Sequence, residues 1–208
     1  MKSIKIALTS MFLILSSYAS AVEISSNVGL SSDYIWRGMT QTEGDIAVNG
    51  GFDLSTDMGF YIGTWASNAK YGTATMELDI YLGFSGEMAE NMTYDVGYIS
   101  VIYPGYDAGD FEEAYVAFNI YGLNILYSDG QDNSPSYSEI GYSVDAGPGS
   151  FNISYGEYED TGDNTLVGYD WGIGDFSLGF YYYDFEVNKN NSQGADDDGA
   201  YVSLSRSF

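Results

Sequence analysis

The sequence contains no cysteine and no histidine. Without cysteine, the chain can form neither a disulfide nor a thiolate nucleophile. Without histidine, it lacks the commonest catalytic base and the commonest zinc ligand, and a Ser-His-Asp triad cannot form. Carboxylate chemistry remains conceivable, but no motif supports it. We therefore predict a protein that is not an enzyme, with no catalytic site, no metal site and no cofactor.

Basic residues are also scarce. The chain has 6 Lys and Arg against 30 Asp and Glu, which gives a formal net charge of −24. Binding to phosphates requires clustered Lys and Arg, so this composition excludes nucleic acid as a partner. Proline is rare (3 residues), whereas Gly (26) and Tyr (21) are abundant. Disordered chains are poor in aromatic residues, so the composition favours long paired strands with aromatic bands.

Long hydrophobic runs are missing too, apart from Ile6–Leu15, which follows a basic start. That run is too short to form a membrane-spanning helix. The small residues Ala19 and Ala21 behind it fit the pattern of a signal-peptidase site. We interpret residues 1–21 as a secretory signal peptide, which leaves residues 22–208 as the mature protein and a single domain.

In the mature part, apolar residues alternate with polar ones in segments of about ten residues, the length of a tilted transmembrane strand. The clearest segment is Met76–Gly86, where five apolar side chains occupy alternate positions. Glu77 and Asp79 occupy the positions between them. Successive side chains of a strand point to opposite faces, so this pattern indicates an apolar exterior and a wet interior.

We predict an all-β fold, a transmembrane antiparallel up-and-down β-barrel of about twelve strands, since bacterial single-chain barrels have an even number. The predicted strands are Glu23–Tyr34, Asp45–Ser55, Gly59–Ser67, Met76–Glu87, Met92–Tyr103, Phe111–Ile120, Leu123–Ser128, Ser136–Asp145, Ser150–Tyr158, Thr165–Ile173, Phe176–Val187 and Ala200–Phe208. Short links with turn-type residues alternate with longer polar links, which include Asn68–Thr75 and Glu159–Asn164. Short turns at one end and long loops at the other are typical of outer-membrane barrels.

The chain ends on an alternating segment, Ala200–Phe208, with an aromatic last residue. We interpret Leu204 and Phe208 as part of the signal that the barrel assembly machinery reads in a closing strand. Arg206 interrupts the apolar face at a position where an apolar residue is expected. The alternative interpretation is the last strand of a secreted β-sandwich.

The stretch Ser31–Thr42 (SSDYIWRGMTQT) resembles the opening of the TorF family, bacterial proteins described as porins or as proteins of unknown function. Further similar segments follow in the same order, and they are Asn49–Asp53, Gly59–Asn68, Glu77–Phe84, Tyr94–Tyr98 with Tyr103–Gly105, and Ser205–Phe208. The resemblance covers nearly all of residues 22–208. It implies an outer-membrane barrel of the porin type and implies no particular solute.

Carboxylates recur on the face that is predicted to line the lumen. These residues are Asp53, Glu77, Asp79, Asp95, Glu113, Glu139, Asp145 and Asp170. A corridor lined by carboxylates and lacking compensating Lys or Arg concentrates cations and repels anions. The alternative is that hydrogen bonds hold these carboxylates as plugs in a narrow barrel.

The pair Asp33 and Arg37 is predicted to lie at the mouth of the barrel, and the two residues share the same parity along the chain. Arg37 pairs there with Asp33 or another carboxylate, and it either shapes a constriction or anchors the first loop as a structural salt bridge. We expect Tyr34 and Trp36 to belong to an aromatic girdle at the lipid interface. The acidic loops around Glu157–Asp163 and Asp196–Asp198 match no EF-hand spacing, so we interpret them as solvated loops. The alternative is that their oxygen-rich side chains hold Ca²⁺ or Mg²⁺.

These features predict a protein of the bacterial outer membrane that works as a porin-like channel for passive diffusion of small solutes. The acidic lumen favours cations or neutral polar solutes. The expected partners are outer-membrane lipid, lipopolysaccharide and the barrel assembly machinery. The alternative is a closed barrel with a structural or adhesive role and no transport activity.

Overall fold

The computed structural model describes residues 21–131, 134–188 and 195–208. Nearly all of the predicted signal peptide, residues 1–20, lies outside the described residues, so the structure does not test it. Within the described ranges, no helix is long and apolar enough to cross a lipid bilayer, and this finding concerns helices alone.

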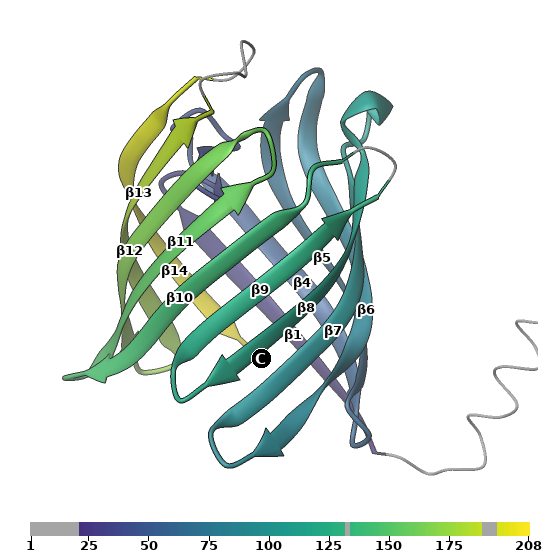
Figure 1. Ribbon diagram of the computed structural model, residues 1–208, viewed down its shortest axis with the longest axis vertical. Coiled ribbons are helices and arrows are strands. Elements are labelled where there is room, and N and C mark those ends of the chain that lie inside the picture. The colour runs from purple at the N-terminus through teal and green to yellow at the C-terminus, as the bar shows by residue number, and fades with distance from the viewer. Residues whose placement is uncertain (1–20, 132–133, 189–194) are drawn as a thin grey trace, which may run out of the picture.

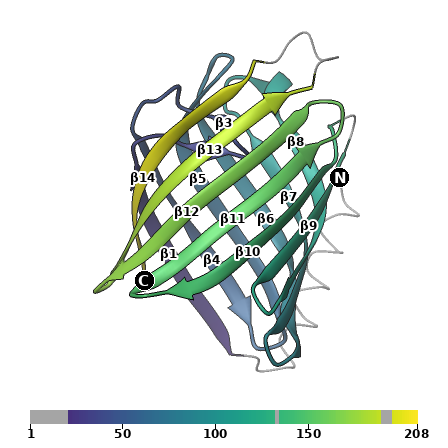
Figure 2. The same ribbon diagram turned by 60° about the vertical axis from the view of Figure 1, so that its left-hand side comes forward.

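Twelve antiparallel strands of the described chain form one closed barrel (Figures 1 and 2). They are β1 (Val22–Ser31), β4 (Ala47–Thr56), β5 (Phe60–Tyr71), β6 (Ala74–Ala89), β7 (Met92–Ile102), β8 (Phe111–Ile120), β9 (Leu123–Gly130), β10 (Tyr137–Ala146), β11 (Gly149–Tyr158), β12 (Gly162–Ile173), β13 (Phe176–Val187) and β14 (Asp197–Ser207). Each strand pairs with its neighbours in the chain. The fold class predicted from the alternating pattern is confirmed.

The barrel closes where the last strand meets the first. β14 pairs with β13 on one side and with β1 on the other, with Leu204 opposite Leu30 at the seam. The backbone N–H of Phe208 donates to the Ser26 carbonyl at 2.8 Å. No edge is left open at this seam, and the expected pairing of the last strand with both neighbours is confirmed.

Two of the predicted long links are wrong. β5 and β6 continue past the apolar stretch and are joined by Gly72 and Thr73 alone. Gly72 has a φ of +59° and permits the tight turn. β12 likewise begins at Gly162. Cross-strand hydrogen bonds extend these hairpins beyond the region where apolar alternation reveals a strand, so the sequence pattern underestimated their length.

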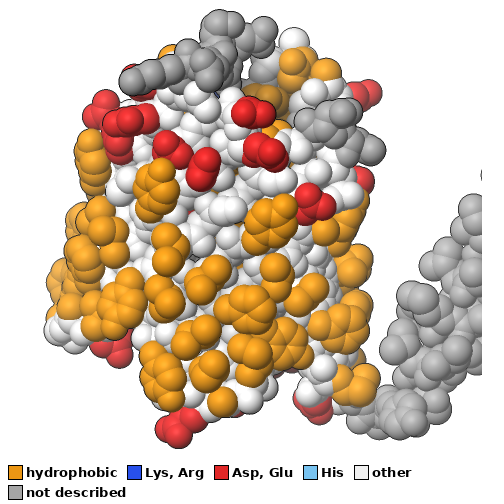
Figure 3. Space-filling view, viewed as in Figure 1, with side chains coloured by type: hydrophobic (Ala, Val, Ile, Leu, Met, Phe, Trp, Pro, Cys, Tyr) orange, Lys and Arg blue, Asp and Glu red, His pale blue; other side chains and the backbone are white. Residues whose placement is uncertain are grey.

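The exterior of the barrel is apolar. Large side chains on the outward parity of the strands are exposed, among them Phe52 at 68% and Ile80 at 42%. Hydrophobic side chains cover the lower and middle part of the face in Figure 3, whereas carboxylates gather at the upper rim. A contiguous apolar belt of this extent marks a surface that contacts lipid or another apolar partner.

Glycines on the inward parity make room for the tyrosine rings of the lumen. A Cβ on Gly63 would overlap the ring of Tyr81, and one on Gly97 would overlap the ring of Tyr115. Eight-stranded barrels are just filled by their own side chains, and barrels of sixteen strands or more leave a wide channel. This barrel is intermediate in size, and tyrosine rings occupy part of its interior.

Candidate functional site

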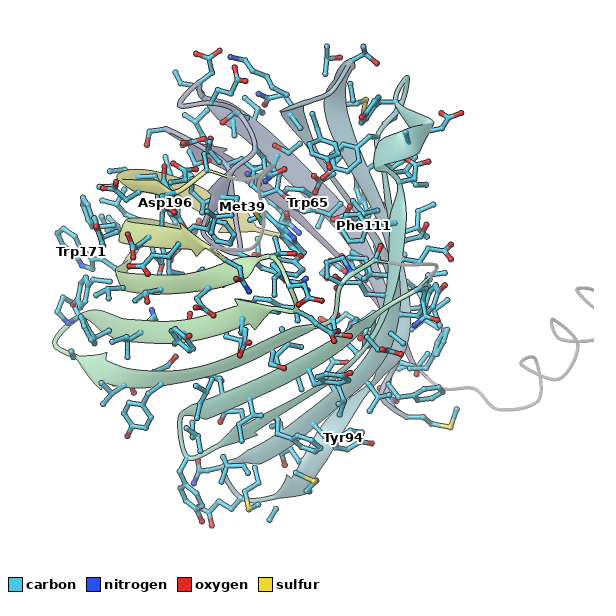
Figure 4. The ribbon with its side chains drawn as sticks, turned by 45° about the horizontal axis from the view of Figure 1, so that its top comes forward. Met39, Trp65, Tyr94, Phe111, Trp171 and Asp196 are labelled. Atoms are coloured by element: carbon cyan, nitrogen blue, oxygen red, sulfur yellow. The ribbon has the colours of Figure 1, made fainter. Side chains whose placement is uncertain are left out.

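The first loop, residues 32–46, turns into the barrel and forms a small hairpin. β2 (Ile35–Trp36) pairs there with β3 (Met39–Thr40). The two turn residues, Arg37 and Gly38, have φ values of +49° and +82°. Positive φ at both central positions defines the type I′ turn that joins short hairpins. Figure 4 shows Met39 and Trp65 inside the ring of strands and Trp171 outside it.

Arg37, at the tip of this hairpin, is bound by the barrel wall. Its guanidinium donates to both carboxylate oxygens of Glu113 on β8, each at 2.7 Å. It also donates to the hydroxyl oxygen of Tyr158 on β11 at 2.5 Å. The two charged side chains are 8% and 3% exposed, which makes this a buried, bidentate ion pair.

Aromatic rings surround the same guanidinium. Its central carbon lies 4.1 Å from the ring centroid of Tyr137, 5.0 Å from that of Tyr158 and 4.7 Å from that of Trp36. Burial lowers the pKa of Arg37, but the hydrogen bond to Glu113 and the other contacts outweigh burial, and the net pKa is raised. Arg37 therefore stays charged, and cation–π contacts add to the ion pair.

Other contacts fix the loop at several points around the lumen. Tyr34 donates to Glu77 on β6 at 2.6 Å, and Trp36 donates to the Tyr158 hydroxyl at 3.3 Å. On the opposite wall, the N–H of Thr40 donates to Asp197 of β14 at 2.9 Å. Contacts with β6, β11 and β14 hold the hairpin across the lumen and constrict it.

Asp33 does not pair with Arg37. Its carboxylate accepts hydrogen bonds from the hydroxyl groups of Thr40 at 2.8 Å and Thr42 at 2.6 Å, and so it ties the two ends of the loop together. The predicted pairing assumed that the first strand continues to Tyr34. The strand ends at Ser31, and the chain then turns inward, which takes Arg37 to Glu113.

The structure also corrects the expectation that Tyr34 and Trp36 lie in an outer aromatic girdle. Both rings lie inside the barrel, where the ring centroid of Tyr34 lies 5.2 Å from that of Trp65, with the two planes tilted by 60°. Burial, reinforced by Glu77 and Asp79, raises the pKa of Tyr34, so its hydroxyl stays protonated and donates to Glu77. Burial and Glu77 raise the pKa of Tyr103 in the same way.

Most of the predicted lumen carboxylates have a tyrosine hydroxyl as partner. Tyr81 donates to Asp53 at 2.6 Å, and Tyr61 donates to Asp95 at 2.6 Å. The remaining pairs are Glu139 with Tyr137 at 2.9 Å, and Asp170 with Tyr181 and, at 2.8 Å, with Asn152. A hydroxyl donor stabilises a carboxylate without neutralising it, so the lumen remains acidic.

The surroundings differ among the other predicted lumen carboxylates, which are Glu77, Asp79, Glu113 and Asp145. Glu77 and Glu113 are both 2% exposed and are bonded to the first loop. Asp79 is 5% exposed, and its Oδ1 has no hydrogen-bond partner among the described residues. Asp145 is exposed near the turn between β10 and β11. The structure therefore brings Glu77 and Glu113 to the constriction and leaves Asp145 at the rim.

Cavities lie on both sides of the hairpin. A cavity of about 380 Å³ near the long loops is lined by Trp36, Tyr103 and Phe111. One of about 230 Å³ on the other side is lined by Trp36, Arg37 and Tyr137. A larger cavity of about 600 Å³, lined by Asp95, Asn119 and Glu139, lies toward the short turns. The hairpin thus separates an outer vestibule, the cavity near the long loops, from an inner vestibule that contains the other two cavities.

Sequence reasoning missed Tyr137 and Tyr158, which contact Arg37, and Ser128, which donates to its partner Glu113. They lie on the inward parity of their strands, but nothing in their local sequence connects them to a residue more than 90 positions earlier. The sequence WRGM at 36–39 contained one usable signal, a two-residue turn ending in glycine between apolar neighbours.

The predicted assembly residues lie at the exposed end of the closing strand. Leu204 is 40% and Phe208 is 65% exposed on the outside of the barrel. Arg206 forms an ion pair with Asp175 at 3.0 Å, at the end of the barrel where β1 begins and β14 ends. The ion pair explains why a charged residue is tolerated on the outward, apolar face of β14, because Arg206 lies at the edge of the apolar belt.

Comparisons with solved structures find proteins of low sequence identity. OccAB2 of Acinetobacter baumannii has a TM-score of 0.44 and 7% identity, over 92% of this chain and 65% of that one. OmpF of Salmonella typhi, in complex with daunomycin, has a TM-score of 0.46 and 9% identity, over 91% of this chain and 98% of that one. This chain thus spans slightly less than two thirds of OccAB2.

Comparisons of sequence give a more specific result. No curated protein matches the chain. The model of one family, Gcw_chp, described as a bacterial protein of unknown function, matches residues 16–125, which is more than half of the 208 residues. On this match, the chain belongs to the Gcw_chp family.

Proposed function

We propose that this protein is an outer-membrane channel that lets small cations and neutral polar solutes diffuse through a lumen narrowed by its first loop. The observation that carries the proposal is the combination of a closed barrel, an apolar belt outside and carboxylate side chains inside. This arrangement suits a protein surrounded by lipid with water in its interior. The resemblance of Ser31–Thr42 to the TorF opening supports the same conclusion.

The proposal includes the cellular location of the protein and its partners. The predicted signal peptide would export the chain, and the closing strand with Leu204 and Phe208 would be read by the barrel assembly machinery. Lipid would contact the apolar belt. Lipopolysaccharide would contact the acidic rim through bridging cations. We propose no catalytic activity.

Selectivity follows from the charges that face the lumen. Arg37 is neutralised by Glu113, whereas Asp53, Asp95 and Asp170 have only neutral hydrogen-bond donors. The field inside the barrel is therefore negative, which raises the local concentration of cations and lowers that of anions.

A second candidate is a closed barrel without transport activity, with a structural or adhesive role. The inward hairpin favours it, because contacts with β6, β8, β11 and β14 hold this segment across the lumen. The two candidates differ in whether ions pass the hairpin.

Planar-bilayer recordings under a KCl gradient test the proposal. The native protein is compared with a variant in which Ile35–Thr40 is replaced by a short Gly-Ser linker. We expect a cation-selective reversal potential for both proteins and a larger single-channel conductance for the variant. Heat-modifiable migration on a gel serves as the control for folding.

Two outcomes would contradict parts of the proposal. Anion preference of a folded, conducting barrel would overturn the selectivity. The absence of conductance from both folded proteins would overturn the channel function and favour the closed barrel. Conductance of the linker variant alone would identify the hairpin as a complete plug.

A further inference from the structure

The groups that bind Arg37 form a site on the barrel wall itself. Glu113, Ser128, Tyr137 and Tyr158 come from the four consecutive strands β8, β9, β10 and β11. Ser128 donates to Oε2 of Glu113 at 2.5 Å and so helps to orient the carboxylate. Glu113, Tyr137 and Tyr158 of the wall contact the guanidinium, as does Trp36 of the loop. Ser128 belongs to the site through its hydrogen bond to Glu113.

The chemistry of this site fits a guanidinium group. The carboxylate of Glu113 accepts two parallel N–H bonds at 2.7 Å, a geometry that matches the planar fork of guanidinium and not the point charge of an ammonium. The Tyr137 ring, at 4.1 Å, offers its face to the plane of the same group. The Tyr158 hydroxyl accepts a further N–H.

From this geometry we propose that the wall carries a binding site for guanidinium compounds, and that Arg37 occupies it as an internal ligand. A solute with a guanidinium group competes with Arg37 for Glu113. The site borders a cavity on each side of the hairpin, since Glu113 and Tyr158 line the outer one and Tyr137 lines the inner one. A small solute can therefore approach it from either vestibule.

Tethering determines how strongly Arg37 competes. A group on a short tether has an effective concentration on the order of mM or more at its site. The native protein is therefore expected to bind a free guanidinium compound weakly, and removal of the Arg37 side chain uncovers the site. Any effect of such a solute on transport rests on the proposed channel function, whereas the binding itself does not.

The test is a fluorescence titration with N-methylguanidinium, a model of the arginine side-chain end, in detergent micelles at constant ionic strength. The chain has 3 tryptophans, so the replacements Trp65→Phe and Trp171→Phe leave Trp36, next to the site, as the only reporter. In this background we compare four proteins: the parent, Arg37→Ala, Arg37→Ala with Glu113→Gln, and Arg206→Ala. Arg206 is the matched control, because it also pairs with a carboxylate and lies near two aromatic rings.

We expect saturable binding to Arg37→Ala that is at least tenfold tighter than binding to the parent, to Arg206→Ala and to the Arg37→Ala, Glu113→Gln protein. Methylammonium should bind Arg37→Ala at least tenfold more weakly than N-methylguanidinium does. Equal binding by all four folded proteins, or no saturable binding to folded Arg37→Ala, would overturn the proposal.

If Arg37→Ala does not fold, Arg37→Lys replaces it, because lysine keeps the charge and loses the bidentate fork. N-methylguanidinium should then bind Arg37→Lys more tightly than it binds the parent, and equal affinities would overturn the proposal. The titration needs no ion flow. Binding without conductance would therefore refute the channel and leave the site intact, whereas conductance without binding would refute the site alone.

Discussion

At the scale of single residues, the first loop depends on Arg37 and Gly38 at the tip of its hairpin. Arg37 provides the buried ion pair with Glu113, and Gly38 provides the backbone conformation and the space that this pair needs. A Cβ on Gly38 would lie 2.6 Å from the Cβ of Asn164 on β12. The hairpin fits against the wall because position 38 has no side chain.

Replacement of Gly38 by alanine should displace the hairpin from the barrel wall. A residue with a Cβ in the left-handed region costs about 1–2 kcal/mol by itself, and the overlap with Asn164 adds to that cost. Gly44→Ala is the matched control, because Gly44 has a similar φ of +78° and no atom within 4 Å of the added Cβ. In urea unfolding of the micelle-embedded barrel, Gly38→Ala should lose clearly more unfolding free energy than Gly44→Ala. Equal losses would refute the close packing of the tip.

Loss of the Arg37 side chain should be far more costly than loss of Arg206. Removing one partner of a buried ion pair leaves an uncompensated charge and costs about 3–5 kcal/mol. The pair of Arg206 with Asp175 is 36% and 73% exposed, and an exposed pair contributes about 0–1 kcal/mol. Urea unfolding of Arg37→Ala and Arg206→Ala measures both losses. Adding Glu113→Gln to Arg37→Ala should restore part of the stability, and no recovery would argue against charge burial as the cause.

At the scale of elements, each strand separates an apolar outer face from a polar inner face, and β6 does so most clearly. Ile80 lies in the middle of its outward stretch from Met76 to Phe84 and is 42% exposed. Glu77 and Asp79 on the same strand face inward and are buried. One strand thus contributes to both the apolar belt and the constriction.

A charge in the middle of the belt should destabilise the barrel, and the same charge at the rim should not. Arginine on a lipid-facing position near the bilayer midplane costs about 2–4 kcal/mol, against about 0–1 kcal/mol near the interface. Ile80→Arg should therefore lose unfolding free energy in lipid vesicles. Asp163→Arg should lose little, because Asp163 faces outward beyond the belt and lies opposite the carboxylates Glu157 and Glu186. Similar losses for the two variants would contradict the position of the belt.

At the scale of the whole molecule, the excess of acidic residues is distributed over two surfaces. One set faces the lumen, as do Asp53, Asp95 and Asp170, and another faces outward near the rim, as do Asp163, Asp184 and Asp198. The three aspartates named in each set contribute equally to the formal net charge. In the proposed channel, only the inner set would lie on the path of a permeating ion, where low-dielectric walls focus its field.

This distribution predicts that selectivity depends on where the charge is removed. Replacement of Asp53, Asp95 and Asp170 by asparagine should reduce the cation-to-anion permeability ratio several-fold in reversal-potential measurements. Replacement of Asp163, Asp184 and Asp198 by asparagine removes the same charge and should leave the ratio nearly unchanged. Equal effects of the two triple variants would mean that net charge, and not the lumen field, determines selectivity.

The sequence by itself determined the barrel. Alternation with a period of two is a local property, and pairing between consecutive strands needs only short turns. The barrel then closes because the first and last strands have unpaired backbone groups that can bond to each other. The parity of Glu77, Ile80 and the other strand residues therefore predicted which side chains face outward and which face the lumen. Composition likewise determined the acidic interior, because the chain has few basic residues to compensate it.

Only the tertiary structure decided what fills the lumen. Arg37 reaches Glu113 and Tyr158 across 76 and 121 residues of sequence, and no local pattern encodes contacts at such separations. The inward course of the first loop depends on the wall groups that assemble when the barrel closes, and on the absence of a side chain at Gly38. For the same reason, hydrogen bonds between neighbouring strands, and not side-chain alternation, set the length of the β5–β6 hairpin.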